Sequence, residues 1–218
     1  MRPDPEPGGE PAPPTLSIPE IRDYQRINSE LATLLDQGHP RIRLEGAEGQ
    51  RLLVAGLVGP WRSVVEVEGR TGPELAAGLH APGLVVVARG PTADGAGRGL
   101  RSGTVLILGE AGDATGCGQS GGLLIVDGPT GHRAGLGQSG GTLVVLGSTG
   151  RLPADRQTGG RFFVDLARLG PHPGRGRRGG RLIELPRLGG LTPDDAEAWR
   201  EVTEAASRWL EPSHWPGS

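Results

Sequence analysis

Residues 94–128 read DGAGRGLRSGTVLILGEAGDATGCGQSGGLLIVDG, and this stretch holds almost two copies of one 19-residue unit. Each unit places a glycine-rich turn segment before a short apolar run, as at 105–108 and 123–126. Three series of glycines keep the spacing of 19: Gly90, Gly109, Gly128 and Gly147; Gly97, Gly116 and Gly135; and Gly103, Gly122, Gly141 and Gly160. Self-similarity at a short fixed period indicates a solenoid, in which each repeat is one coil stacked on the last.

A period of 19 is too short for a pair of helices and fits one coil of a parallel β-helix, with three short strands and three bends. The composition agrees, because 40 of the 218 residues are Gly, and glycine adopts φ > 0 without a Cβ penalty. We therefore predict an all-β solenoid of about six coils, roughly 25–30 Å long at ~4.8 Å per stacked strand. The predicted turn glycines are Gly97, Gly99, Gly116, Gly118, Gly135 and Gly137.

The segments around the repeat divide the chain into six parts. They are a disordered, proline-rich tail (1–16), an N-terminal helix (17–38), the β-helix (39–167), a basic Arg/Gly loop with a last strand (168–190), a C-terminal helix (191–210) and a tail (211–218). Strands before the regular coils are predicted at 41–44, 51–54, 63–67 and 84–87, and the last strand at 181–185.

Capping patterns place the two helices. Ser17 and Glu20 form a capping box, with Pro19 in the first turn, where a missing N–H costs little. Thr192 is the expected N-cap of the C-terminal helix, and Asp194 and Asp195 follow it at the positive end of the helix dipole. Both helices carry an apolar face, so we expect each to pack on another element.

Alternation along the strands predicts an outward apolar stripe. Val105 and Ile107 face the interior, and the residues between inward positions face outward. We name the outward set the stripe, and its members are Val87, Leu106, Ile125, Val144 and Phe163. In the coil before it the outward positions are Glu66 and Glu68, so the outer face is expected to be wet there. A contiguous apolar surface is not left in water: one of the chain's own helices covers it, which we favour, or a partner protein does.

Composition excludes several classes of protein. The net charge of −2 gives no reason to expect nucleic acid or an anionic membrane, although all 23 basic residues are Arg. The single cysteine, Cys117, allows neither a disulfide framework nor a cysteine-ligated cluster within the chain. No apolar run approaches ~18 residues, and residues 1–14 lack the apolar region of a signal peptide. We expect a cytoplasmic protein.

Candidate reactive groups are few. Cys117 lies in a tight Gly-Cys-Gly turn and has no repeated counterpart, so we interpret it as a bystander thiol. The five histidines are dispersed, and Asp94 and Asp113 are followed at the next repeat positions by His132 and Arg151, so no metal site is predicted.

Stacked amides can hydrogen-bond along the axis, so we interpret Gln119, Gln138 and Gln157 as a structural ladder. No catalytic, cofactor-binding or metal-binding residue is predicted.

The basic segment near the end of the repeat has two interpretations. Its arginines are Arg175, Arg177, Arg178 and Arg181. They could contact phosphate or an acidic partner, or they could form a solvated loop. We favour the loop, because no aromatic residues alternate with the arginines.

The repeat, taken with its flanks, resembles the GXGXG domain, the right-handed β-helix that closes the large subunit of glutamate synthase and occurs elsewhere as a separate subunit. The matching pieces are IRDYQRINSELATLLDQG (21–38), RIRLEGAEGQRLLVAGLVG (41–59), VEVEGRTGPELAAGL (65–79) and the coils 94–128 quoted above. The resemblance covers about residues 20–166. It implies the right-handed sense of the β-helix.

The resemblance further implies a non-catalytic scaffold, because the glutaminase cysteine, the flavin barrel and the iron–sulfur cysteines of glutamate synthase lie outside this domain. FMN and the iron–sulfur cluster are then expected only in partner subunits. The expected partners are a glutaminase-type amidotransferase subunit and an FMN-dependent glutamate synthase-like subunit, as in N-methylglutamate synthase-type complexes. A looser similarity, to the β-helix subunit of formylmethanofuran dehydrogenase and of the related formyltransferase/hydrolase complex, is the alternative. A solenoid acyltransferase is disfavoured, because those enzymes repeat hexapeptides, giving 18 residues per coil.

Overall fold

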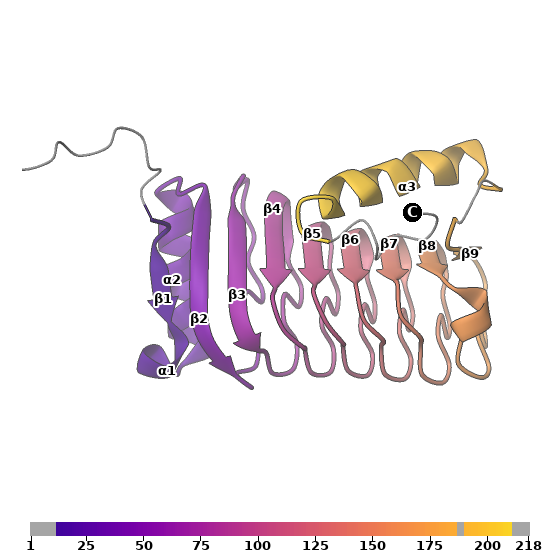
Figure 1. Ribbon diagram of the computed structural model, residues 1–218, viewed down its shortest axis with the longest axis horizontal. Helices are drawn as coiled ribbons and strands as arrows, with labels where there is room; N and C mark the ends of the chain where they lie inside the picture. The colour runs from indigo at the N-terminus through magenta and orange to yellow at the C-terminus, as the bar shows by residue number, and fades with distance from the viewer. Residues whose placement is uncertain (1–11, 187–189, 211–218) are drawn as a thin grey trace, which may run out of the picture.

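The chain folds into one elongated, right-handed β-solenoid. The computed structural model describes residues 12–186 and 190–210. Within them a single parallel sheet holds nine strands in sequence order, β1 to β9. In Figure 1 each strand runs downward on the near side, the chain returns behind it, and the next strand lies one step to the right, which is the path of a right-handed helix.

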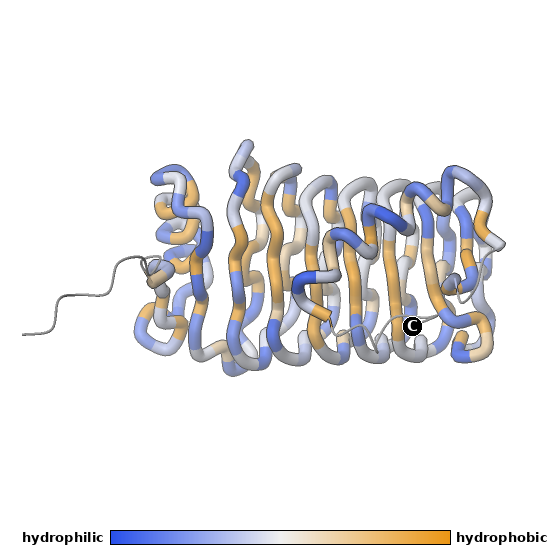
Figure 2. Tube along the Cα trace, turned by 45° about the horizontal axis from the view of Figure 1, so that its top comes forward, coloured by the Kyte–Doolittle hydropathy of each residue, from blue (hydrophilic) through white to orange (hydrophobic). Residues whose placement is uncertain are grey.

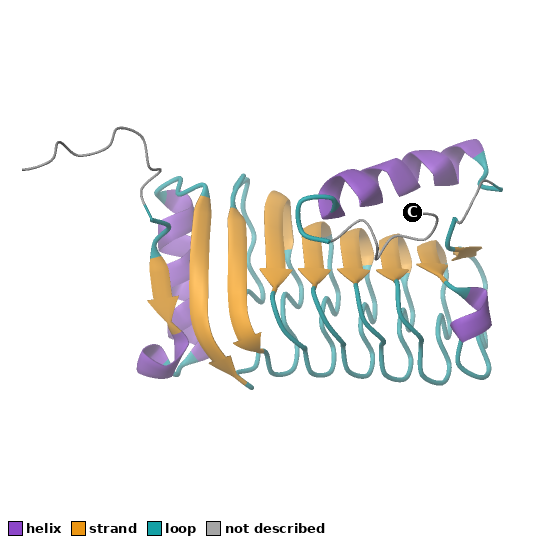
Figure 3. Ribbon diagram, viewed as in Figure 1, coloured by secondary structure: helices purple, strands orange, loops and turns teal. Residues whose placement is uncertain are grey.

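The described elements have the following bounds. The strands are β1 (Thr15–Ser17), β2 (Arg41–Glu48), β3 (Val64–Arg70), β4 (His80–Ala88), β5 (Ser102–Ile107), β6 (Ser120–Val126), β7 (Ser139–Val145), β8 (Gly159–Val164) and β9 (Arg181–Glu184). The helices are α1 (Ile18–Ile21), α2 (Tyr24–Asp36), the 3-10 turn η1 (Leu166–Arg168) and α3 (Pro193–Ala206). Figure 3 shows that loops make up most of each coil outside its strand.

Each regular coil contains one strand, not the three that the period predicted. After the strand, the chain makes a single bridge to its neighbours, in the series Thr71, Thr92, Ala111, Thr130 and Thr149. The rest of the coil is the glycine-rich turn. The turn is not a strand because three of its residues have positive φ, which is incompatible with an extended backbone.

The turn has the same backbone in seven coils. At alternate positions it places three residues at φ > 0, as in Gly95, Gly97 and Gly99 at 74°, 65° and 64°. After the first turn, in which Val54 N–H donates to Asn28 Oδ1 of α2, the middle residue donates its N–H to the preceding coil. Before the seventh turn, the outer two donate to the following coil. Gly97 N–H, for example, bonds to Leu75 O, and Gly99 N–H to Cys117 O, both at 2.8 Å. The five interior turns are therefore backbone-paired to both neighbours.

Two of these turns lie where the sequence predicted something else. The predicted strand 51–54 is the first turn, with Leu52 at φ 58° and Val54 at φ 60°. The predicted loop 168–180 contains the seventh turn, in which His172, Gly174 and Gly176 take φ of 63° to 67°. Non-glycine residues pay about 1–2 kcal/mol each for this conformation, and the hydrogen bonds to the adjacent coil offset the cost. The solenoid thus has seven coils, where about six were predicted.

The predicted N-terminal helix is broken in two. The chain leaves α1 at Arg22 (φ 61°), and the Asp23 carboxylate caps α2 by accepting the Gln25 N–H at 2.9 Å. Ser17 stands at the N-cap of α1 as predicted, with a proline in the first turn, but its side chain makes no capping bond. Ser17 is also the last residue of β1, opposite Glu45 of β2. Strand β1 also includes residues 15 and 16 of the predicted tail, while residues 1–11 and 211–218 lie outside the described residues.

The interior of the solenoid is aliphatic. Inward residues of successive strands stack in columns, such as Val105, Leu124, Leu143 and Phe162, and all are fully buried. Figure 2 shows these apolar strands as parallel bands. Helix α2 closes the N-terminal end of this core with the buried residues Ile27, Leu31 and Leu35.

Because the coils stack closely, one column of glycines tolerates an added Cβ far less well than another. A Cβ on Gly128 would lie 2.7 Å from the carbonyl carbon of Gly109 in the previous coil, whereas a Cβ on Gly118, at φ 66°, would meet no atom within 4 Å. We expect Gly118→Ala to cost about 1 kcal/mol for its φ alone, and Gly128→Ala roughly 3 kcal/mol, because backbone must move. Urea unfolding of both variants measures the difference. Equal destabilisation would contradict this account of coil spacing.

Candidate functional site

The outward apolar stripe is covered by the chain's own C-terminal helix. Figures 1 and 2 show α3 crossing the outer face of the later strands. The five stripe residues are at most 1% exposed, and Ala198, Val202 and Ala206 of α3 pack in the same cluster with them. The rings of Phe163 and Trp199 lie 5.2 Å apart. The alternative of a stripe left for a partner is therefore wrong for this structure, and the self-covered alternative holds.

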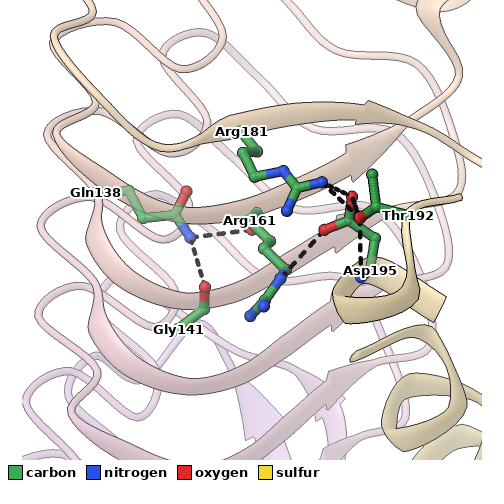
Figure 4. Close-up of polar contacts among 6 residues, drawn as sticks. All are labelled: Gln138, Gly141, Arg161, Arg181, Thr192 and Asp195. Carbon is green, nitrogen blue, oxygen red and sulfur yellow. Dashed lines mark hydrogen bonds and ion pairs between the residues drawn. The ribbon is translucent and has the colours of Figure 1, made fainter. Parts of the chain in front are cut away.

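A buried carboxylate anchors the beginning of α3. Asp195, 3% exposed, accepts from Arg161 Nε at 3.3 Å, from Arg181, and from Thr192 Oγ1 at 2.9 Å. Arg161 and Arg181 are neighbours in the register of β8 and β9, and Figure 4 shows both guanidinium groups converging on the carboxylate. Thr192 caps the helix as predicted, accepting the Asp195 N–H at 3.3 Å. This network fixes where α3 starts along the solenoid.

A second charged cluster receives the end of α3. Glu66, expected to lie in water, is only 1% exposed and pairs with Arg89 at 2.6 Å and Arg41 at 3.3 Å. Both guanidinium groups lie over the ring of Trp209, at 5.4 and 5.9 Å from its centroid. The prediction that Glu66 is exposed to water was wrong, because the chain just after α3 extends over β3. Glu68 is half-buried and lies 3.3 Å from Arg89.

The predicted glutamine ladder is buried and mainly ties side chains to backbone. Gln157 Nε2 donates to Gln138 Oε1 at 3.0 Å, the one amide-to-amide step among the three. Gln138 donates to the carbonyls of Gly141 and Arg161, as drawn in Figure 4, and Gln119 donates to Thr142 O at 3.1 Å. The bonds of Gln119 and Gln138 join a turn to the strand of the next coil, and that of Gln157 joins two turns, which is a structural role.

The six predicted turn glycines fall into two columns with different surroundings. A Cβ on Gly97, Gly116 or Gly135 would meet core side chains such as Leu124, Leu143 or Phe162. Gly99, Gly118 and Gly137 face open space. All six have positive φ, so their identities follow from backbone geometry and packing.

A ladder that sequence reasoning missed runs through Asp94, Asp113 and His132. The side chain of each accepts the backbone N–H of the residue 19 positions later: Asp94 from Asp113, Asp113 from His132, and His132 Nδ1 from Arg151, at 2.7–2.8 Å. The signal was visible in the sequence, since all three residue types carry an acceptor at the same repeat position. The chemical change from Asp to His concealed it.

Reactive side chains do not gather in the part of the chain that the structure describes. Cys117 is a partly exposed free thiol. His80 Nδ1 lies 2.9 Å from Ser102 Oγ, but over residues 12–186 and 190–210 no carboxylate bonds to that imidazole. The same residues contain no cluster of three His, Cys, Asp or Glu side chains able to hold a metal ion. The predicted arginine cluster divides: Arg181 turns toward Asp195, while Arg175, Arg177 and Arg178 are exposed on the last coil.

A scan of protein-family models, a search of curated proteins and a search of solved structures find no match for this chain. Within the described residues, no helix has the length and apolar character needed to cross a membrane.

Because α3 covers the stripe, the attachment of α3 to the solenoid depends on the apolar face of this helix. Val202 is fully buried against the stripe, whereas Arg200 on the same helix is exposed. We expect Val202→Asp to detach α3, because an unpaired buried carboxylate costs about 4 kcal/mol or more. Arg200→Asp should change stability by less than about 0.5 kcal/mol. Binding of an apolar fluorescent dye should rise only in the first variant, and an equal rise in both would contradict the assigned packing.

Proposed function

We propose that this chain is a non-catalytic scaffold subunit of a glutamate synthase-like assembly. In this role it holds a glutaminase-type amidotransferase subunit and an FMN-dependent synthase subunit in fixed relative positions, so that ammonia passes between their sites. The observation that carries the proposal is the turn geometry: the backbone of the GAGRG turn (95–99), which lies in one of the segments that carry the family resemblance, recurs in seven coils, from Leu52 to Gly176.

The mechanical character of the fold supports this role. Each of the five interior turns is hydrogen-bonded to the coils before and after it, and α2 and α3 are packed onto the solenoid through buried residues. Such a body resists sharp local bending, because separating two coils on one side would break several coil-to-coil bonds together. A subunit that keeps two active sites aligned needs this rigidity, and in this proposal flavin and iron–sulfur chemistry belong to the partners.

The proposal predicts loss of coupling rather than loss of chemistry when the subunit is removed. We expect the tagged chain, purified natively from its source cells, to bring along a glutaminase-like and a flavoprotein synthase-like subunit, identified by mass spectrometry. The assembly without this chain should keep glutaminase activity and ammonia-dependent synthesis but lose glutamine-dependent synthesis.

Two outcomes would count against this assignment. Co-purification with an amidohydrolase-like subunit instead would favour the formyl-transfer alternative. A chain that is isolated alone, folded and monomeric, would contradict the scaffold role, provided that the untagged lysate contains both expected subunits.

A further inference from the structure

The last coil has two backbone N–H groups that lack acceptors within the described chain, although the equivalent groups of every earlier coil donate to the following coil. In the six preceding turns, the first and third φ > 0 residues donate their N–H groups to the following coil; Leu152 donates to Pro171 O and Arg156 to Arg175 O, both at 2.8 Å. The equivalent groups of the seventh turn are the N–H groups of His172 and Gly176. No further coil follows them in the described chain, and neither has an acceptor there. Both donors therefore face the C-terminal end of the solenoid.

Strand β9 adds an open edge at the same end. It is the last strand of the sheet and pairs only with β8 among the described strands. Leu185 N–H donates to Val164 O at 3.1 Å. In a parallel ladder this pattern turns the backbone groups of Leu182 and Glu184 away from β8. A hollow of about 360 Å³ lies along β9, and its lining includes Arg177, Arg181 and Leu182. Two carboxylates also line it, but both are engaged: Glu184 accepts the Leu166 N–H, and Asp195 pairs with Arg161 and Arg181.

The charge of this end differs from that of the whole chain. Residues 168–184 contain five arginines and one glutamate, although the chain has a net charge of −2. Arg168 and Arg181 are paired with Asp165 and Asp195. Arg175, Arg177 and Arg178 are exposed and form no ion pair within the described residues. Free guanidinium groups next to orphan N–H donors match carboxylates on an extended backbone.

A second copy of this chain does not fit the surface. Two C-terminal ends placed face to face would oppose their arginines, and α2 closes the interior at the N-terminal end, so head-to-tail stacking has no continuous core. A nucleic acid offers no backbone that pairs with a strand edge, and no aromatic side chains alternate with these arginines to stack bases.

We propose that the C-terminal end of the solenoid binds an acidic, extended polypeptide segment of a partner protein. The segment adds a strand to β9, its carbonyls accept from the outward backbone N–H groups, and its carboxylates pair with Arg175, Arg177 and Arg178. The inference deepens the scaffold proposal, on which it rests for the partner being a protein of the same assembly.

The test uses the full chain and a short fluorescent peptide of alternating glutamate and valine, measured by anisotropy. We expect binding that weakens with salt and falls by about tenfold or more in the variant Arg175→Glu, Arg177→Glu, Arg178→Glu. The control variant Arg70→Glu, Arg101→Glu, Arg151→Glu makes the same charge change at exposed positions in other coils and should change affinity less than about twofold. Amide exchange measured by NMR should slow at His172, Gly176, Leu182 and Glu184.

Each other outcome overturns the proposal. Equal loss in both variants would mean non-specific charge attraction. Tighter binding of poly-uridylate than of the peptide, with no amide protected in β9, would assign the surface to nucleic acid. Absence of peptide binding alongside a successful native co-purification would reject this docking surface and leave the scaffold role standing, so the two proposals fail separately.

Discussion

The pairing of one coil's turn with the next is the interaction on which the rest of this molecule depends. In each turn three residues at alternate positions have positive φ, and in the interior turns their N–H groups point forward, backward and forward along the axis. Buried backbone groups that lack partners are costly, and in each interior turn the N–H groups of the three φ > 0 residues find their partners in the neighbouring coils. One coil by itself could not hold this backbone, and stability must come from stacking.

Stacking explains the composition of the columns. Where successive backbones approach most closely, as at Gly109 and Gly128, no Cβ fits without moving the main chain. Where the backbone needs only positive φ, other residues are tolerated, including Leu52 and Arg133. The interior columns, by contrast, are filled by large aliphatic side chains and Phe162, which supply the hydrophobic driving force.

A solenoid also exposes surfaces that its repeat cannot close. The N-terminal end is closed by α2, and the outer face of the sheet is closed by α3. Charged groups mark both limits of α3: Asp195 meets Arg161 and Arg181 at its start, and Glu66 with its arginines meets Trp209 beyond its end. The apolar stripe attracts α3 without fixing its position, because hydrophobic contact is non-directional. The polar contacts at its two ends fix where α3 lies along the stripe. The C-terminal end receives no such cover from the described chain, and its character is basic and polar.

The sequence by itself determined the solenoid, the inward and outward alternation of its strands, the glycine columns and the capped C-terminal helix. These follow from a strict period and from local rules that each repeat obeys independently. Only the tertiary structure decided that 51–54 and 168–180 are turns, because their positive φ is imposed by hydrogen bonds from adjacent coils and leaves little trace in residue type. It alone decided that α3 covers the stripe, that Asp23 rather than Ser17 caps the long N-terminal helix, and that Glu66 is buried. Those outcomes depend on which surfaces meet in space, and the spacing of residues along a chain carries no information about that.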